Sequence, residues 1–333
     1  MFGDTVPSEL PDKWAMSIRQ PIGIAGIITP WNFPMAIPCW KMMPALVTGN
    51  TVVFKPASDT PHCATLLVEL MAEAGFPAGT VNLVTGTGGE VGDAIVESPD
   101  VGVISFTGSS ATGRSIAAKA GAKLKRLSLE LGGKSAAVVL DDADLAAAVK
   151  GTVSACFLNS GQTCSAHTRM LVPESRYAEA AKLAAEEAQQ YALGDPLDEK
   201  TKLGPLTSAA QRERVRGYIR KGLEEGAALL AGGPDAPEGL GKGYYVKPTV
   251  FGKVNPKSTI AQEEIFGPVL SIITYRDEAE AIRIANDTPY GLGGGVWSAS
   301  EERALKVARR LRTGQVDING APFNMFAPFG GFK

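Results

Sequence analysis

The sequence has few of the residues that build metal sites and disulfide frameworks. Its 333 residues include two histidines and four cysteines, Cys39, Cys63, Cys156 and Cys164. The cysteine spacing fits no C-x-x-C pair, and two histidines are too few for the usual zinc ligand sets, so we expect no metal site. Four cysteines in a chain this long do not indicate a disulfide framework, which favours a reducing, cytoplasmic compartment.

Long apolar runs and blocks of like charge are also lacking. The net charge is -2 and the charged residues, 20% of the chain, are scattered, so the sequence predicts no face that binds nucleic acid. No apolar run reaches the roughly 18 residues that a membrane span needs. Residues 1–14 do not have the basic and apolar regions of a secretory signal. What is left is a globular protein of ordinary composition, long enough for about two domains.

Short apolar runs alternate with longer amphipathic segments. Strand-like runs at 22–28, 51–55, 80–86, 101–108 and 125–133 alternate with helix-like segments at 35–49, 59–75, 89–98 and 109–121. This alternation predicts an α/β fold with a mostly parallel sheet covered by helices on both faces. Longer helices are expected at 141–159, 175–193 and 208–226, the first with Asp141 or Asp142 as its N-cap. The segment 231–245, rich in glycine and proline, predicts an exposed loop.

Two glycine-rich turns follow neighbouring strands. Gly86–Gly92 (GTGGEVG) and Phe106–Gly113 (FTGSSATG) each come after a strand and open a helix, where backbone N–H groups can approach a phosphate. The first misses the GxGxxG spacing and is equally compatible with a plain tight turn. Two such turns at the carboxyl edge of one sheet favour a nucleotide-binding cleft.

Three polar side chains near strand ends each allow two interpretations. Lys55 ends an apolar strand and either reaches a ribose or phosphate or extends its stem along the surface. Glu130 lies in an apolar strand, where burial would raise its pKa toward that of a general base, or where backbone N–H groups would hold it as a structural carboxylate. Asn32 either directs an amide N–H toward an oxyanion or caps a helix.

Cys164 follows a polar loop, Asn159–Thr163. The other three cysteines lie in helix-like apolar segments, where a free cysteine usually acts as a small buried residue. A cysteine in a polar loop is accessible and can be activated as a nucleophile. A catalytic pair with His167 is disfavoured, because residues three apart in a turn that leads into a strand need not face each other.

These segments together resemble the aldehyde dehydrogenase superfamily across essentially the whole chain. The resemblance is carried by TPWNFP, GNTVVFKPAS, FTGSSATG, LELGGK, NSGQTC, EEIFGPV and PFGGFK, in this order. It implies a Rossmann-like parallel-sheet cofactor domain at 22–132, a second α/β catalytic domain at 133–333 and a hairpin oligomerisation arm at 3–21. Family members extend further at both ends, so the chain is expected to be truncated. A homo-oligomer, either a dimer or a tetramer, is implied for the full-length form.

The resemblance implies oxidation of an aldehyde to a carboxylic acid with NAD or NADP. Cys164 matches the nucleophile, which forms a thiohemiacetal and then a thioester, and Glu130 matches the base that activates water to hydrolyse the thioester. The Asn32 amide and the Cys164 backbone N–H match the donors that hold the oxyanion. Lys41 lies where the family often has a lysine near the catalytic carboxylate.

The cofactor and substrate positions also follow from the resemblance. Lys55 matches the residue at the adenosine ribose and Glu264 the residue at the nicotinamide ribose. Many members that prefer NAD have a glutamate where this chain has Ser58, so serine there predicts that NADP is tolerated alongside NAD. The other cofactor positions are Trp31, Gly88, Gly92, Gly108, Ser109 and Phe266. The aldehyde tunnel corresponds to Trp40, Leu158 and Phe323, which are apolar and include no arginine, favouring medium-chain aliphatic or aromatic aldehydes over semialdehydes.

Two other functions are compatible with the resemblance. A CoA-acylating enzyme would pass the acyl group to CoA rather than to water, and Glu130 argues against it because that route needs no water-activating base. A non-catalytic, truncated relative that acts structurally is the other alternative, and the short length of the chain is the feature that supports it.

Overall fold

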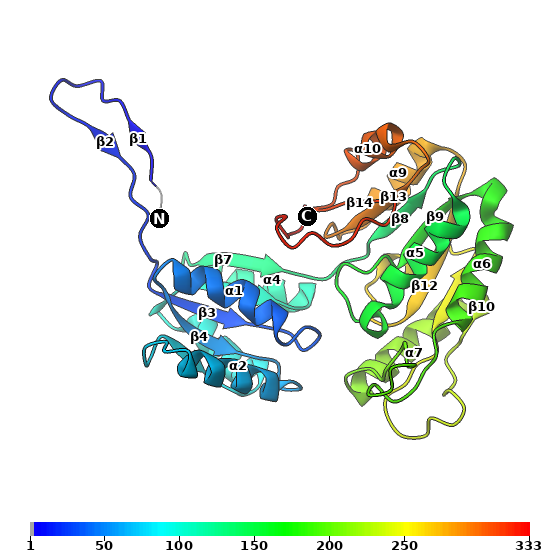
Figure 1. Cartoon of the computed structure of the whole chain (residues 1–333), viewed down its shortest axis with the longest axis horizontal. Coiled ribbons are helices and arrows are strands. Elements are labelled where there is room, and N and C mark those ends of the chain that lie inside the picture. Colours follow the sequence, from blue (N-terminus) through cyan, green and yellow to red (C-terminus); the bar gives the residue numbers. More distant parts are fainter. Residues whose placement is uncertain (1–2) are drawn as a thin grey trace. The chain divides into compact units, whose positions relative to one another are not determined.

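The computed structural model describes residues 3–333 and divides the chain into two units, Met1–Glu130 and Leu131–Lys333. The first unit begins with a two-stranded antiparallel hairpin, β1 (Thr5–Val6) and β2 (Ala15–Met16), in which Thr5 lies opposite Met16 (Figure 1). Both strands are exposed to solvent. The hairpin falls within residues 3–21, where the resemblance places an oligomerisation arm.

A parallel sheet of five strands forms the rest of the first unit. Its spatial order is β5-β4-β3-β6-β7. The strands are β3 (Ile24–Ile28), β4 (Thr51–Lys55), β5 (Val81–Leu83), β6 (Val101–Thr107) and β7 (Arg126–Glu130). The connecting helices are α1 (Ala36–Val47), α2 (Pro61–Glu73), α3 (Asp93–Glu97) and α4 (Ser110–Gly121). The strand order changes direction beside β3, as in doubly wound sheets.

Alternation of side chains along β3 explains how helices cover both faces of this sheet. Ala25 and Ile27 point to one face, where they pack with Met42 of α1 and Leu67 of α2 in a buried cluster. Gly26 points to the other face, where a Cβ would lie 2.5 Å from Ile95 of α3. Because both of its faces are covered, the central strand β3 is apolar throughout, whereas the edge strand β7 (RLSLE) carries polar residues.

A mixed sheet of seven strands forms the centre of the second unit. Its order is β10-β11-β12-β9-β8-β13-β14, and only β10 runs antiparallel to its neighbour. The strands are β8 (Ala136–Val139), β9 (Arg169–Pro173), β10 (Ala228–Ala231), β11 (Thr249–Gly252), β12 (Val269–Tyr275), β13 (Gly294–Trp297) and β14 (Asp317–Ile318). The helices are α5 (Leu145–Phe157), α6 (Tyr177–Gln189), α7 (Ala209–Glu224), α8 (Thr259–Gln262), α9 (Glu278–Asn286) and α10 (Glu301–Ala308). The expected α/β class with parallel sheets is confirmed.

Two buried clusters lie on opposite faces of the second sheet. Helices α5 and α6 cover one face, as Figure 1 shows, and pack against alternate residues such as Met170 and Val172 of β9. Helices α7 to α10 pack against the residues that point the other way, such as Leu171 of β9. In the part of the chain that the structure describes, every helix is too short or too polar to cross a bilayer.

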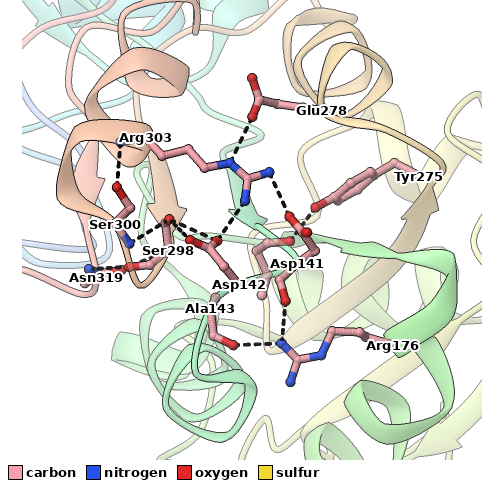
Figure 2. A network of polar contacts seen from close by, with 11 residues as sticks. Asp141, Asp142, Ala143, Arg176, Tyr275, Glu278, Ser298, Ser300, Arg303 and Asn319 are labelled. Atoms are coloured by element: carbon pink, nitrogen blue, oxygen red, sulfur yellow. Dashed lines mark hydrogen bonds and ion pairs between the residues drawn. The ribbon is translucent and has the colours of Figure 1, made fainter.

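An ionic network closes the carboxyl ends of β8 and β13 (Figure 2). Arg303 of α10 lies 2.7 Å from Asp141 Oδ1 and 3.1 Å from Asp142 Oδ1, and it also contacts Glu278 at 3.2 Å. Ser298 donates to Asp142 in turn. These contacts tie the ends of β8 and β13 to α9 and α10.

The same region corrects the expected N-cap of α5. The helix begins at Leu145, and Asp144 is its N-cap, with Oδ1 accepting from Ala147 N at 3.0 Å. Asp141 and Asp142, the expected caps, instead pair with Arg303. The expected choice was wrong because three aspartates lie close together in sequence, and only the position of Arg303 in space distinguishes their roles.

Candidate active site

In the first unit, the candidate residues lie at the carboxyl ends of the parallel strands. Lys55 is the last residue of β4, Thr107 of β6 and Glu130 of β7. Trp31 and Asn32 follow the end of β3. Since parallel strands end at the same edge, these side chains share one edge of the sheet, the edge at which doubly wound folds bind ligands.

Lys55 is buried rather than spread over the surface. It is 4% exposed, and its Nζ donates to Pro56 O at 3.0 Å. Burial lowers the pKa of its ammonium group. The surface interpretation of Lys55 is therefore wrong, because the end of β4 turns the side chain inward. An open groove lies next to it, where Ser58 Oγ donates to Gly86 O at 3.2 Å. The groove is lined by Pro56, Ala57, Ser58, Pro61, Thr85, Gly86 and Thr87.

The two glycine-rich turns open helices after β5 and β6, as the sequence predicts. Gly88 and Gly92 begin and end a single π-helical turn that leads into α3. Ser109 is the N-cap of α4, and its Oγ accepts from Thr112 N at 3.2 Å. Gly108 lies against the ring of Phe106, where a Cβ would come within 2.5 Å. The glycine is required there by a close approach.

Glu130 and Lys41 perturb each other's ionisation. Lys41 of α1 donates to Ser105 Oγ at 3.0 Å and to Phe106 O at 3.3 Å. Burial lowers the pKa of Lys41 to about 8, and the charge of Glu130 opposes this shift. Burial raises the pKa of Glu130, and the Lys41 charge opposes that shift. Glu130 Oε2 is buried without a hydrogen-bond partner among residues 3–333, which favours a titrating carboxyl over a fully bonded structural one.

Asn32 does not cap α1. The helix begins at Ala36 and its N-cap is Met35, so Asn32 lies three residues before the cap. The capping interpretation was wrong because the turn after β3 is longer than the sequence indicates. Trp40, on the same helix, is 51% exposed.

In the second unit, Cys164, Glu264 and Phe266 lie at the amino ends of the strands, as does the backbone of Gly133. Gly133 precedes β8, Cys164 precedes β9, and Glu264 and Phe266 precede β12. These three strands are parallel neighbours, so their amino ends meet at one edge. The Arg303 network lies at the opposite, carboxyl ends of β8 and β13 (Figure 2).

The loop before Cys164 has an unusual backbone that many contacts hold in place. Asn159, Ser160 and Gly161 have consecutive φ values of +53°, +55° and +74°. Two non-glycine residues in this region store strain, which persists where the surroundings fix the loop. Ser160 Oγ donates to Gly204 O at 3.0 Å, and Gln162 Oε1 accepts from Thr207 N at 3.0 Å. Cys164 is half-buried at the end of this fixed loop.

Glu264 is held by the strand connection that follows Glu130. Its Oε1 accepts from Gly133 N at 2.9 Å. Burial raises the pKa of the Glu264 carboxyl, whereas the Gly133 N–H and the charges of Lys134 and Arg214 oppose that shift. Phe266 lies two residues later with a φ of +63°, and Gln211 Nε2 donates to its carbonyl at 2.7 Å. The expected strand 125–133 ends at Glu130 because the following backbone bonds to Glu264 instead of a strand.

His167 lies against Asp317, with Nε2 3.7 Å from Oδ2. Burial lowers the pKa of His167 to about 4, so its imidazole is neutral at neutral pH. The two apolar candidates of this unit, Leu158 and Phe323, are 58% and 53% exposed. The Phe323 ring meets Phe329 edge-on, with centroids 6.2 Å apart.

Sequence reasoning missed two buried cations at the amino edge, Lys134 and Arg169. Lys134 is 2% exposed and its Nζ has no hydrogen-bond partner within the described chain. Burial, with the nearby Arg169 charge, lowers the pKa of Lys134 to about 7. Arg169 donates to Lys134 O, Ile284 O and Ala285 O at 2.8 to 3.0 Å. The LGGK motif contained the signal for Lys134, but nothing local in the sequence distinguishes Arg169 from a surface arginine.

Comparison with known proteins connects this arrangement to one family. The family model described as aldehyde dehydrogenase family matches residues 1–333. A 3-succinoylsemialdehyde-pyridine dehydrogenase from Pseudomonas sp is 49% identical over 316 residues, which are 95% of this chain and 66% of that protein. The chain thus spans slightly less than two thirds of the length of this relative.

The solved structures that are similar to this chain include other aldehyde dehydrogenases. A mutant of aldehyde dehydrogenase C from Pseudomonas syringae, in complex with NAD+ and octanal, is 48% identical with a TM-score of 0.94. The match covers 95% of this chain and 65% of that one. An aldehyde dehydrogenase from Mycobacterium tuberculosis in complex with NAD+ is 45% identical with a TM-score of 0.96, covering 99% of this chain and 68% of that one.

Proposed function

The chain belongs to the aldehyde dehydrogenase family, and on this premise we propose that it oxidises an aldehyde to a carboxylic acid with NAD or NADP. The observation that carries the hydrolytic form of the reaction is Glu130, a half-buried carboxyl whose pKa is raised by burial at the end of β7. A carboxyl whose pKa is raised accepts a proton from water more readily than an ordinary one, as a general base must. The NAD+ complexes of related structures support the choice of cofactor.

The residues fit a dinucleotide by their chemistry. Lys55 is a buried cation with one of its three N–H donors used by Pro56 O, which leaves donors for a ribose or phosphate. Glu264 presents a carboxylate to which ribose hydroxyls can donate, with one oxygen held by Gly133 N. The remaining proposed cofactor residues are Trp31, Ser58, Gly88, Gly92, Gly108, Ser109 and Phe266. When bound, the cofactor supplies the acceptor for the hydride that leaves the aldehyde carbon.

The proposed steps on the protein's own groups begin with Cys164. Its thiolate attacks the aldehyde carbonyl carbon and forms a thiohemiacetal, whose oxyanion would be held by the Asn32 amide and the Cys164 backbone N–H. Loss of hydride leaves a thioester on Cys164. Glu130 takes a proton from a water molecule, the water oxygen attacks the thioester carbon, and the thiolate of Cys164 leaves as the acid forms. Lys41, whose charge opposes protonation of Glu130, would adjust that base.

Glu130 also bears on the CoA-acylating alternative. That route needs no water-activating base, so a partly buried carboxyl with a raised pKa would be a cost without a use. Formation of acid in the absence of CoA distinguishes the two reactions.

The proposed substrates are medium-chain aliphatic or aromatic aldehydes. Trp40, Leu158 and Phe323 are apolar residues with much of their side-chain surface exposed, which suits an apolar chain. The octanal complex of a related structure supports this choice, whereas the name of the Pseudomonas relative points to a semialdehyde with an aromatic ring. Rates with octanal, benzaldehyde and succinate semialdehyde test it, and activity confined to the last would contradict it.

The organisation of the whole protein is also a proposal. We assign residues 22–132 to cofactor binding, 133–333 to catalysis and 3–21 to an oligomerisation arm in a dimer or tetramer. The exposed hairpin β1–β2 supports the arm. Four free cysteines support a reducing, cytoplasmic compartment.

The decisive experiment measures NAD(P)H formation from an aldehyde panel with wild-type protein, Cys164→Ala and Glu130→Gln. We expect Cys164→Ala to be inactive. Glu130→Gln should give a stoichiometric burst of NAD(P)H followed by turnover about 100-fold or more slower, because the thioester forms but is not hydrolysed. Unchanged turnover in Cys164→Ala would refute the mechanism. A folded wild-type chain that neither binds NAD(P) nor reacts with iodoacetamide at Cys164 would favour a non-catalytic protein.

A further inference from the structure

Gly132 and Gly133 lie between two of the proposed site residues of the second unit. Neither glycine has a φ in the left-handed region, so a positive φ is not the reason for glycine at either position. A side chain at either position would have no space. A Cβ on Gly132 would lie 2.3 Å from Oε2 and 2.7 Å from Cδ of Glu264, and a Cβ on Gly133 would lie 2.1 Å from the carbonyl oxygen of Cys164.

The backbone of Gly132 and Gly133 therefore contacts both the loop that carries Glu264 and the loop that carries Cys164. On one side, Gly132 packs directly against the Glu264 carboxylate and Gly133 N donates to its Oε1 at 2.9 Å. On the other side, Gly133 packs against the backbone of Cys164. The loops themselves also meet closely, because a Cβ on Gly161 would lie 2.1 Å from the carbonyl carbon of Gly267. Each of these backbone segments therefore packs so closely on the next that no side chain, not even a methyl group, fits between them.

We propose that Gly132 and Gly133 are positioning residues whose missing side chains form the space that holds the Glu264 carboxylate and the Cys164 backbone at a set separation. The functional meaning of that separation rests on the proposed function, in which Glu264 holds the nicotinamide ribose and Cys164 attacks the aldehyde. The steric contact itself stands without it. A methyl group at Gly132 displaces the carboxylate, and a methyl group at Gly133 displaces the Cys164 loop.

A double-mutant cycle tests the Gly132 contact without cofactor or substrate. Thermal unfolding is measured for Gly132→Ala in the wild-type chain and in a Glu264→Ala chain. In the wild-type background we expect the midpoint to fall by about 2 to 4 °C, because the methyl group pushes the Glu264 carboxylate out of its hydrogen bond with Gly133 N. In the Glu264→Ala background the vacated space accepts the methyl group, so the fall should largely disappear. Equal falls in both backgrounds would overturn the proposal.

Alkylation of Cys164 tests the Gly133 contact. Labelling of the Cys164 peptide by iodoacetamide is followed by mass spectrometry in Gly132→Ala, Gly133→Ala and the matched control Gly217→Ala. Gly217 lies in α7, where a Cβ would have no atom within 4 Å. We expect severalfold altered labelling in folded Gly133→Ala and wild-type rates in the other two. A folded Gly133→Ala chain that labels at the wild-type rate would contradict the proposal. A Gly133→Ala chain that fails to fold while Gly217→Ala folds would support the steric contact.

NAD+ titration separates this inference from the proposed function. Gly132→Ala should weaken NAD+ binding, as should Glu264→Ala. A positive double-mutant cycle together with unchanged NAD+ affinity would refute the ribose role of Glu264 while leaving the steric contact in place.

Discussion

Replacing Arg169 with methionine removes three buried hydrogen bonds that join β9 to its surroundings. The guanidinium is 1% exposed and donates to Lys134 O at 2.9 Å, Ile284 O at 3.0 Å and Ala285 O at 2.8 Å. Ile284 and Ala285 are in the last turn of α9, where the carbonyls lack the usual i+4 partner, although Ile284 O also accepts from the N–H of the C-cap residue Asp287 at 3.3 Å. Arg169 therefore caps α9 and fastens it to the start of β8.

The expected loss of stability follows from these bonds and from the burial of the charge. Hydrogen bonds from a charged donor contribute about 2 kcal/mol each. Burial opposes them, since it lowers the pKa of Arg169 from its ordinary value to about 10, a shift of roughly 3 kcal/mol against the charged form. The difference leaves a loss of about 3 kcal/mol, at the lower end of what breaking a buried charged contact costs. For a unit of this size, the midpoint of thermal unfolding should fall by about 6 to 12 °C.

Thermal unfolding by circular dichroism measures this loss, with Arg276→Met as the matched control. Arg276 makes two hydrogen bonds to Glu280, at 2.9 and 3.0 Å, but its side chain is 71% exposed. An exposed pair of this kind contributes little, so the control should unfold close to the wild-type temperature. Arg169→Lys should lose most of the stability too, because an ammonium cannot form the three-way fork. Equal midpoints for Arg169→Met and Arg276→Met would refute the reasoning.

Three further outcomes are expected. Ser58→Glu should lower kcat/KM for NADP relative to NAD by about tenfold or more, because a carboxylate beside the groove repels a 2′-phosphate. An unchanged ratio of the two kcat/KM values in steady-state assays would show that Ser58 is not in the cofactor site. Between pH 7 and 8.5, the free energy of unfolding of the wild-type chain should rise relative to that of Lys134→Met. Burial lowers the pKa of Lys134 to about 7, so in this range the unfolded chain binds a proton that the folded chain has released; parallel urea-derived profiles for the two proteins would contradict this. Asp144→Ala should lower the free energy of unfolding by about 1 kcal/mol through loss of the α5 N-cap, whereas Asp198→Ala, in an exposed loop, should lower it by less. Urea unfolding measures both free energies.

The sequence was most informative where chemistry is carried by local motifs. The alternation of apolar runs and amphipathic segments predicted the parallel sheets, because a strand buried on both faces must be apolar throughout. The turns at Gly86–Gly92 and Phe106–Gly113 were placed correctly between strand and helix, since glycine and N-cap residues act over a few neighbours. The presence of Glu130 in a strand was likewise readable from the LSLEL segment, although the expected strand ran on to residue 133 and the observed one ends at Glu130.

Where the sequence failed, the missing information was spatial. Lys55 was open to two interpretations because a lysine at a strand end can point either way, and only the fold shows it 4% exposed. The N-cap of α5 was misplaced because Asp141 and Asp142 form ion pairs with Arg303. Arg303 lies about 160 residues away in sequence, so no local pattern indicates this pairing. Asn32 was an acceptable cap by type, and the length of the turn before α1 decided otherwise.

By itself, then, the sequence determined the α/β class, the family and the residue types that the proposed chemistry needs, because those are properties of local pattern and of single side chains. Only the tertiary structure decided why LELGGK contains two glycines. Their reason is not a backbone angle but the presence of Glu264 and Cys164 within van der Waals distance. Close approach between segments more than 30 residues apart leaves no trace in local sequence other than the absence of a side chain, so its cause becomes visible only when the segments are seen together.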